Sequence, residues 1–245
     1  MESNRFANAE GVSMRVMTLF FLVDTSGSMD GKKIGQVNEA IRNVIPEIQK
    51  ISDGNADAEI KISVLRFSTV AEWVSPPEPV ANFHWRDLDA DGTTALGDAC
   101  EKLNEKLSKS GFMSAAAGSF APAIFLMSDG DPTDEYASKL AKLKANPWFK
   151  AGVKAAIAIG NDANEDVLAE FTGSREAVVK VHTPEALGRL ISFIAVTSSQ
   201  VASQPMADKN GSSDDGQSAA QNALEAQMTE FTADGGWDTG DDEGW

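Results

Sequence analysis

Three separated stretches of the sequence carry short oxygen-bearing side chains that suit a hard divalent cation. Asp24, Ser26 and Ser28 alternate along the motif DTSGS, so their side chains can point the same way in an extended turn. Two further stretches, DGTT and SDGD, contribute Thr94 and Asp129. Carboxylate and hydroxyl oxygens without His or Cys favour Mg²⁺, with Mn²⁺ or Ca²⁺ as the next choices. If the stretches converge, these side chains form one metal site.

The elements that must position this site follow an alternating strand and helix pattern. A nearly continuous apolar run over 14–23 and an apolar run over 123–127 predict strands buried on both faces, and each leads into one of the two carboxylates. A helix is predicted over 32–49, bent or ended by Pro46, and another over 95–108. Ligands of open α/β sheets bind at the carboxyl ends of strands, which is where this pattern places the oxygen-rich stretches.

The rest of the pattern extends the same architecture. It predicts further strands over 60–67, 70–74, 153–159 and 177–181, an irregular segment over 76–91, and helices over 135–144, 164–171 and from Pro184 to Ile194. Such alternation predicts an α/β fold, doubly wound, with a mostly parallel central sheet and helices on both faces.

The composition changes near residue 198, which divides the chain into three predicted regions. These are an N-terminal extension over 1–13, the α/β domain over 14–197, and a flexible acidic C-terminal tail over 198–245 with a short helix over 219–231. The tail carboxylates could serve only to keep the chain in solution. Alternatively the tail binds a partner through its apolar side chains, which are Leu224, Met228, Phe231, Trp237 and Trp245.

Charge and cysteine content exclude several classes of function. The formal net charge of −16 argues against nucleic acid and against anionic membrane surfaces as partners. The single cysteine, Cys100, can form neither a disulfide framework nor a Cys zinc site, which favours a reducing compartment. The start of the chain lacks the features of a signal peptide, and no apolar run is long enough to span a bilayer. A cytoplasmic location is therefore expected.

The three oxygen-rich stretches, in this order, resemble the metal-ion-dependent adhesion site (MIDAS) of von Willebrand factor A (vWA) domains. DTSGSM is similar to the DxSxS element of that family, GTTALG to its second loop and FLMSDG to its third loop. The resemblance covers about residues 14–197 and implies a Rossmann-like sheet. Within the family, TALG and FLMSDGDPTD look similar to the bacterial TerY-like branch from tellurite-resistance gene clusters.

The resemblance also implies roles for individual residues. Ser26 and Ser28 are expected to contact the metal directly, and Thr94 directly or through water. Asp24 and Asp129 are expected to act mainly through water or hydrogen bonds. The family leaves one coordination position for an Asp or Glu of a partner protein. The TerY-like branch further implies a Ser/Thr kinase and a PP2C-type phosphatase as partners, although the cysteine-rich zinc module of some relatives is replaced here by the acidic tail.

Several other side chains have simpler explanations. Asp131, Thr133 and Asp134 are more typical of caps and turn formers than of ligands, although they can line the rim of the site. Cys100 lies on an apolar helix face, which is typical of a core residue.

Three functions remain open at the level of sequence. The first is a non-enzymatic, metal-dependent adaptor that binds another protein. The second is a Mg²⁺-dependent phosphotransfer enzyme, which is disfavoured because the general-acid position holds Ser26 and no P-loop pattern is present. The third is a scaffold subunit that binds through its tail, or whose tail supplies an acidic residue to its own metal site as a plug.

Overall fold

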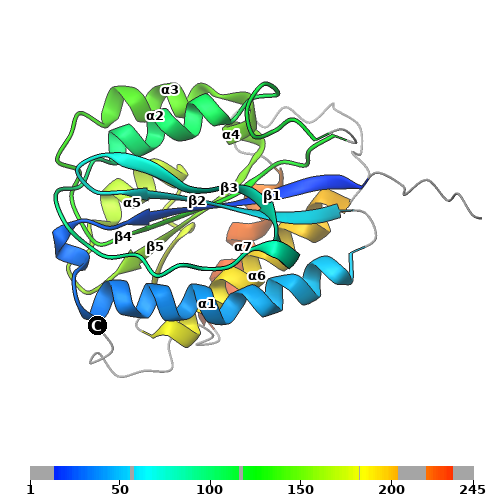
Figure 1. Ribbon diagram of the computed structural model, residues 1–245, viewed down its shortest axis with the longest axis horizontal. Coiled ribbons are helices and arrows are strands. Elements are labelled where there is room, and N and C mark those ends of the chain that lie inside the picture. The colour runs from blue at the N-terminus through cyan, green and yellow to red at the C-terminus, as the bar shows by residue number, and fades with distance from the viewer. Residues whose placement is uncertain (1–13, 56–57, 116–117, 182, 204–218, 234–245) are drawn as a thin grey trace, which may run out of the picture.

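A computed structural model describes residues 14–55, 58–115, 118–181, 183–203 and 219–233 of the chain. Within these ranges a single sheet has the strand order β3-β2-β1-β4-β5-β6, and helices lie on both of its faces (Figure 1). The strands are β1 (Arg15–Asp24), β2 (Ala58–Phe67), β3 (Ala71–Pro79), β4 (Ala123–Ser128), β5 (Val153–Ile159) and β6 (Val178–Val181). All neighbouring strands are parallel except β2 and β3. The predicted fold class is confirmed.

The helices follow the strands in the alternation that the sequence predicts. They are α1 (Lys32–Asp53), α2 (Leu96–Lys106), α3 (Ala137–Ala145), α4 (Pro147–Ala151), α5 (Glu165–Thr172), α6 (Pro184–Ser203) and α7 (Ala219–Ala233). Two short 3₁₀ helices, η1 (Gly27–Met29) and η2 (Val80–Asn82), follow β1 and β3. No helix in the described ranges combines the length and apolarity needed to cross a bilayer.

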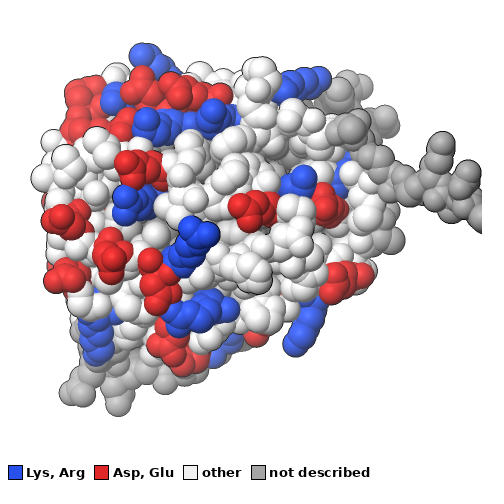
Figure 2. Space-filling model, viewed as in Figure 1, with Lys and Arg blue, Asp and Glu red and all other residues white. Residues whose placement is uncertain are grey.

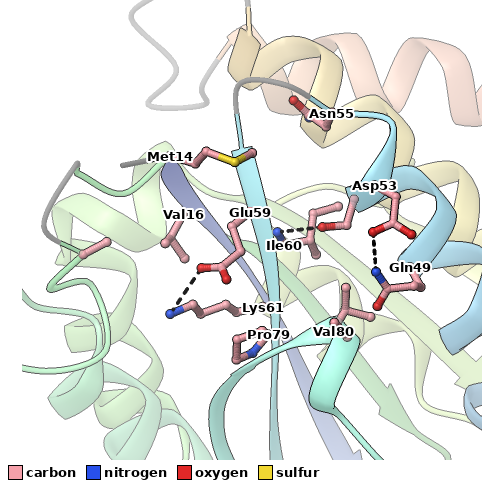
Figure 3. A pocket seen from close by; sticks show the side chains of 13 residues that line it. Met14, Val16, Gln49, Asp53, Asn55, Glu59, Ile60, Lys61, Pro79 and Val80 are labelled. Carbon is pink, nitrogen blue, oxygen red and sulfur yellow. Dashed lines mark hydrogen bonds and ion pairs between the residues drawn. The ribbon is translucent and has the colours of Figure 1, made fainter. Parts of the chain in front are cut away.

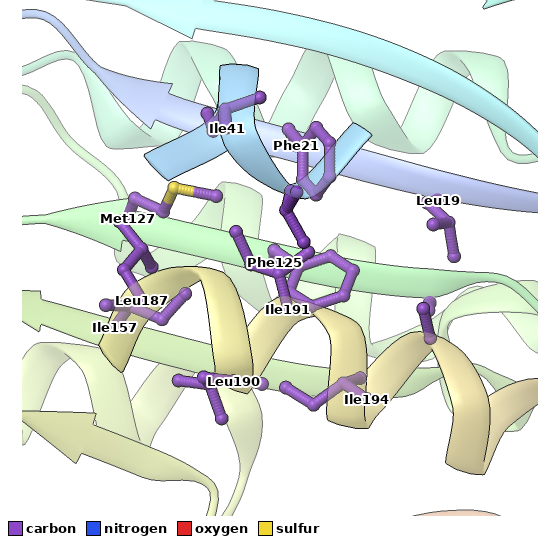
Figure 4. Packing of buried hydrophobic residues seen from close by; sticks show 14 of the residues in the cluster. Leu19, Phe21, Ile41, Phe125, Met127, Ile157, Leu187, Leu190, Ile191 and Ile194 are labelled. Atoms are coloured by element: carbon purple, nitrogen blue, oxygen red, sulfur yellow. The ribbon is translucent and has the colours of Figure 1, made fainter. Parts of the chain in front are cut away.

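The central strand β1 is buried on both faces, and its side chains alternate between two cores. Leu19 and Phe21 point to the face covered by α1 and α6, where both belong to one core cluster with Ile191 of α6. The ring of Phe21 packs against Phe125 of β4 (Figure 4). Phe20 points to the other face, which α2, α3, α4 and α5 cover. Since strands buried on both faces need continuous apolar runs, the sequence of β1 fits its central place.

The structure corrects several predicted boundaries. β3 continues through the prolines of the predicted irregular segment as far as Pro79. This is possible because β3 is an edge strand, whose outward N–H groups need no partner strand. α1 contains Pro46 and does not end there, because Ile48 and Ile51 continue its buried face to Asp53.

The C-terminal part of the described chain also differs from the prediction. α6 runs to Ser203, past the predicted domain boundary at residue 197. α7 spans Ala219–Ala233 and contacts α6 and β5. Helix α7 is therefore packed on the domain, whereas the sequence suggested a flexible tail there.

Candidate metal centre

The strand order places one end of the sheet where a ligand site is expected. The chain winds outward from β1 through β2 to β3 and then crosses back to β4 on the other side of β1. In an open α/β sheet, the carboxyl ends of the strands at such a reversal form a crevice. The loops after β1 and β4 lie there, together with the crossover segment that leads into α2.

Asp24, the last residue of β1, is fully buried and fixes the first loop. Its Oδ1 accepts a hydrogen bond from the backbone N–H of Ser26 at 2.8 Å, and its Oδ2 accepts one from the Ser128 hydroxyl at 2.6 Å. Burial raises the pKa of this carboxyl group above its usual value, although both hydrogen bonds oppose that shift. Asp24 therefore ties the end of β1 to the end of β4 and orients the DTSGS turn.

A chain of hydrogen bonds joins the first loop to the third. The hydroxyl oxygens of Ser26 and Ser28 lie 3.0 Å apart, and the Ser28 hydroxyl donates to Asp129 Oδ1 at 2.8 Å. Ser26 and Asp129 are buried, whereas Ser28 is exposed at the surface. The row of polar oxygens thus extends from the buried ends of β1 and β4 to the surface, where a ligand can reach it.

Thr94 joins this cluster from the second loop. A Cβ atom placed on Gly130 lies 3.5 Å from Ser28 Oγ and 3.6 Å from Thr94 Oγ1, so the two hydroxyls converge on the same backbone position. The five side chains predicted as the metal site are therefore brought together. They come from three loops that are far apart in the sequence.

Backbone hydrogen bonds hold the first and second loops against each other. The N–H of Gly27 donates to the carbonyl of Gly92 at 3.0 Å, and the N–H of Asp91 donates to the carbonyl of Thr25 at 2.8 Å. A Cβ placed on Gly27 would lie 3.3 Å from the Gly92 carbonyl oxygen, so the missing side chain lets the two loops approach closely. Gly92 itself has a positive φ of 82° that favours glycine.

The side chains predicted as caps or rim residues fasten the second loop to the third. Thr133 accepts a hydrogen bond from the backbone N–H of Thr94 at 3.0 Å through its hydroxyl, and its own N–H donates to the Thr94 carbonyl at 2.8 Å. The carboxylate of Asp134 accepts from the N–H groups of Gly97 and Asp98, each at 3.0 Å. These residues position the loops through the backbone.

Asp134 thus caps the start of α2. The N-cap residue of this helix is Ala95, whose methyl side chain cannot accept a hydrogen bond. Asp131 is exposed and accepts a hydrogen bond from the side chain of Asn164. Of the three predicted rim residues, Asp131 is the one that hydrogen-bonds the loop leading into α5.

Lys33, in the first turn of α1, belongs to the cluster although it is not among the predicted site residues. Its Nζ lies 2.5 Å from Asp129 Oδ2 and 2.9 Å from Asp162 Oδ1. Burial lowers the pKa of Lys33, but its hydrogen bonds to the two carboxylates outweigh this and raise the pKa above the ordinary value. The hydrogen bond from Lys33 in turn lowers the pKa of Asp162. The available signal was a lysine at the second position of the helix that follows the DTSGS motif.

The donor set fits a hard divalent cation. Two ligands at neighbouring corners of an Mg²⁺ octahedron with Mg–O bonds of about 2.1 Å lie about 3.0 Å apart, and the Ser26 and Ser28 oxygens are separated by 3.0 Å. Within the described ranges, no three His, Cys, Asp or Glu side chains are grouped to hold a metal. A site here must therefore use hydroxyl oxygens, as the DTSGS motif provides.

The tail residues predicted to bind a partner have a different environment. Leu224 and Met228 are buried in the same core cluster as α6, so in this arrangement they face their own domain. The side chain of Phe231 and the positions of Trp237 and Trp245 lie outside the described residues. Binding of a partner through these residues stays a prediction, and for Leu224 and Met228 it requires α7 to leave the domain.

A cavity among the described residues lies away from the candidate metal centre. It has a volume of about 680 Å³ and is bordered by the starts of β1 and β2 and the end of α1 (Figure 3). An ion pair between Glu59 and Lys61 spans one wall. The loops of the candidate metal centre follow the carboxyl ends of the strands, whereas the cavity lies where β1 and β2 begin. The cavity therefore lies at the opposite end of the sheet.

The face seen in Figure 2 carries acidic and basic side chains interspersed with uncharged surface. This face shows no broad basic patch of the kind that binds a phosphate backbone.

A sheet of this strand order with an oxygen-lined loop cluster at its reversal point defines a Rossmann-like α/β domain with a candidate cation site. The sequence profile of the von Willebrand factor type A domain matches residues 18–192, so the chain belongs to this family. No curated protein matches the chain.

Several solved structures share the fold. A von Willebrand factor type A protein from Catenulispora acidiphila is 20% identical with a TM-score of 0.54, covering 76% of this chain and 43% of its own. Proximal thread matrix protein 1 from the mussel byssus, solved with a zinc-occupied MIDAS motif, is 15% identical with a TM-score of 0.55, covering 76% and 48%. The PilB minor pilin of Streptococcus sanguinis is 16% identical with a TM-score of 0.58, covering 81% and 65%.

At these identities the likeness extends to the fold alone. The chain spans less than half the length of the first two of these proteins.

Proposed function

We propose that this chain is a non-enzymatic protein-binding module that holds one divalent cation, Mg²⁺ in the first place, with Mn²⁺ or Ca²⁺ as alternatives. The observation that carries the proposal is the convergence of Ser26, Ser28, Thr94 and Asp129 at the surface end of β1 and β4. The Ser28 hydroxyl donates a hydrogen bond to Asp129, which leaves lone pairs of the hydroxyl oxygen for a metal.

The partner is proposed to be a protein that offers an Asp or Glu side chain. The two buried carboxylates are already engaged by hydrogen bonds to Ser26, Ser28 and Ser128. A cation bound mainly by neutral hydroxyl groups keeps much of its charge and attracts a further carboxylate. The exposed position of Ser28 gives such a carboxylate access from solvent.

The burial of Asp24 argues against phosphotransfer chemistry. A nucleophilic aspartate needs a carboxylate oxygen that can approach a substrate, whereas Asp24 is fully buried with both oxygens accepting hydrogen bonds. The position two residues on, where an acid is needed, holds Ser26.

The sequence resemblance to the TerY-like branch motivates a finer hypothesis. It suggests a bacterial stress or defence system with a Ser/Thr kinase and a PP2C-type phosphatase as partners. This hypothesis rests on the motif similarity, and affinity purification from the native cell with and without EDTA is the test. Recovery of neither enzyme as an EDTA-sensitive partner would reject it.

The metal proposal is tested by titrating Mn²⁺ into the full chain by calorimetry and by measuring partner capture with and without EDTA. Ser26→Ala removes one hydroxyl ligand and is expected to abolish Mn²⁺ binding and capture while the circular dichroism spectrum is unchanged. Ser138→Ala makes the same chemical change at an exposed position on α3 and serves as the matched control. Capture that persists in EDTA and in Ser26→Ala would contradict the proposal.

A further inference from the structure

One cationic side chain lies inside the candidate metal centre, and the proposed function does not use it. The ammonium of Lys33 contacts Asp129 Oδ2 at 2.5 Å, while the other oxygen of the same carboxylate contacts Ser28 Oγ at 2.8 Å. A single carboxylate group therefore separates a fixed positive charge from the hydroxyl ligands. The Lys33 side chain is only 18% exposed, so solvent and salt screen this charge incompletely.

We propose that Lys33 is a built-in competitor for the charge of the metal ion: it lowers the intrinsic affinity of the site for a divalent cation and thereby couples metal binding to the partner's carboxylate. This inference rests on the proposed function and concerns how the same site is regulated. It assigns to Lys33 an electrostatic role that opposes metal binding.

The charges at the site support this role. Asp24 and Asp129 are hydrogen-bonded to the ligand residues Ser26 and Ser28, and the Lys33 ammonium offsets the charge of Asp129. Asp162 pairs with Lys33 from the other side, but its side chain is 72% exposed, so its charge is well screened at the metal position. A divalent ion at Ser26 and Ser28 is therefore attracted by less than the charge of two carboxylates.

The same balance of charges favours binding of a partner's carboxylate. A carboxylate that joins the metal restores the negative charge that Lys33 has offset, so the metal binds more tightly when the carboxylate is present. Because coupling between two ligands is reciprocal, the metal raises the affinity for the carboxylate by the same factor. A site with this balance binds the cation strongly only as part of a complex.

A purely structural role for Lys33 predicts the opposite outcome. If the ammonium only holds Asp129 in place, removing it loosens the carboxylate and weakens metal binding. If the ammonium repels the metal, removing its charge strengthens metal binding. The sign of the change in affinity therefore separates the two roles.

The experiment is a calorimetric titration of Mn²⁺ into the full chain at fixed pH and ionic strength. Lys33→Met keeps the length of the side chain but removes the charge, and we expect the Kd for Mn²⁺ to fall about tenfold or more, as expected for removing a like charge at close range in a poorly screened site. Lys33→Arg retains the charge and is expected to retain most of the suppression. Lys50→Met, in the last turn of α1, makes the same charge change at the far end of the helix and is the matched control.

A second arm repeats the titrations in the presence of acetate as the smallest carboxylate probe. Acetate is expected to tighten Mn²⁺ binding more for the natural chain than for Lys33→Met. An unchanged or weaker affinity in Lys33→Met overturns the inference while the proposed metal site stands. An absence of Mn²⁺ binding in the natural chain and in every variant overturns the metal site and the inference together.

Discussion

Helix α7 offers the most demanding test of the packing described above, through the side chain of Gln221. This side chain is fully buried, and its amide bonds both backbone groups of Lys154: the Lys154 N–H donates to Oε1 at 2.7 Å, and Nε2 donates to the Lys154 carbonyl at 3.0 Å. The ladder between β5 and β6 begins only at Ala156, so at Lys154 the glutamine takes the place of a neighbouring strand. Gln221→Ala leaves both groups buried without these partners.

The expected loss in the free energy of unfolding follows from a cost and from an upper limit on that cost. A buried backbone group without a partner costs about 1–3 kcal/mol, and two such groups are affected. The cost cannot exceed the free energy that docks α7, which the burial of Leu224 and Met228 supplies at about 1.5–3 kcal/mol each before the loss of chain entropy. We therefore expect the free energy of unfolding to fall by about 2–4 kcal/mol, with α7 detaching at the upper end of this range.

Hydrogen exchange and urea denaturation measure the two outcomes separately. In Gln221→Ala the Lys154 amide is expected to exchange faster, and the urea midpoint is expected to fall. Asn222→Ala changes the adjacent, exposed residue of α7 and is expected to alter neither. An unchanged exchange rate at Lys154 together with an unchanged midpoint would refute the reasoning that α7 completes the edge of β5.

Two further predictions concern charged side chains. Burial lowers the pKa of Lys154 from 10.5 to about 8, so the folded chain binds fewer protons than the unfolded chain between these values. Lys154 should therefore contribute up to about 3 kcal/mol of additional urea stability as the pH rises from about 8 to 10.5. This contribution is measured as the difference in pH dependence between the natural chain and Lys154→Met, and exposed Lys150→Met should behave as the natural chain does. Asp134→Ala removes the cap of α2 and should lower the melting temperature, at a cost of about 1–2 kcal/mol, whereas Asp131→Ala should cost less because Asp131 caps no described helix; equal losses in the two variants would argue against the capping role.

The fold class and the ligand-bearing loops could be predicted from local sequence patterns. The run that forms β1 is apolar from Val16 to Val23 except at Thr18, and such a run in an alternating pattern indicates a central parallel strand. Asp24 follows directly, and the serines of DTSGS are fixed in spacing by the chain itself. Sequence alone therefore determined which residues lie at the carboxyl end of the sheet.

Other features depend on which elements meet in three dimensions. Lys33 forms ion pairs with Asp129 and Asp162, which follow it in the chain by 96 and 129 positions. No local sequence pattern indicates such distant pairs. Asp134 is of a residue type that commonly caps the helix that follows it. In the structure it instead caps α2, which precedes it in the chain. In both cases the packing of loops at the sheet end selects the partner.

The C-terminal region shows the same division most clearly. Leu224 and Met228 have the spacing of an amphipathic helix, and this local pattern correctly predicted a helix there. It did not reveal what covers the apolar face, because one helical stripe can pack equally well on a partner or on its own domain. Only the tertiary structure, in which β6 is too short to reach Lys154 and leaves an edge for Gln221, decided that the helix belongs to the domain.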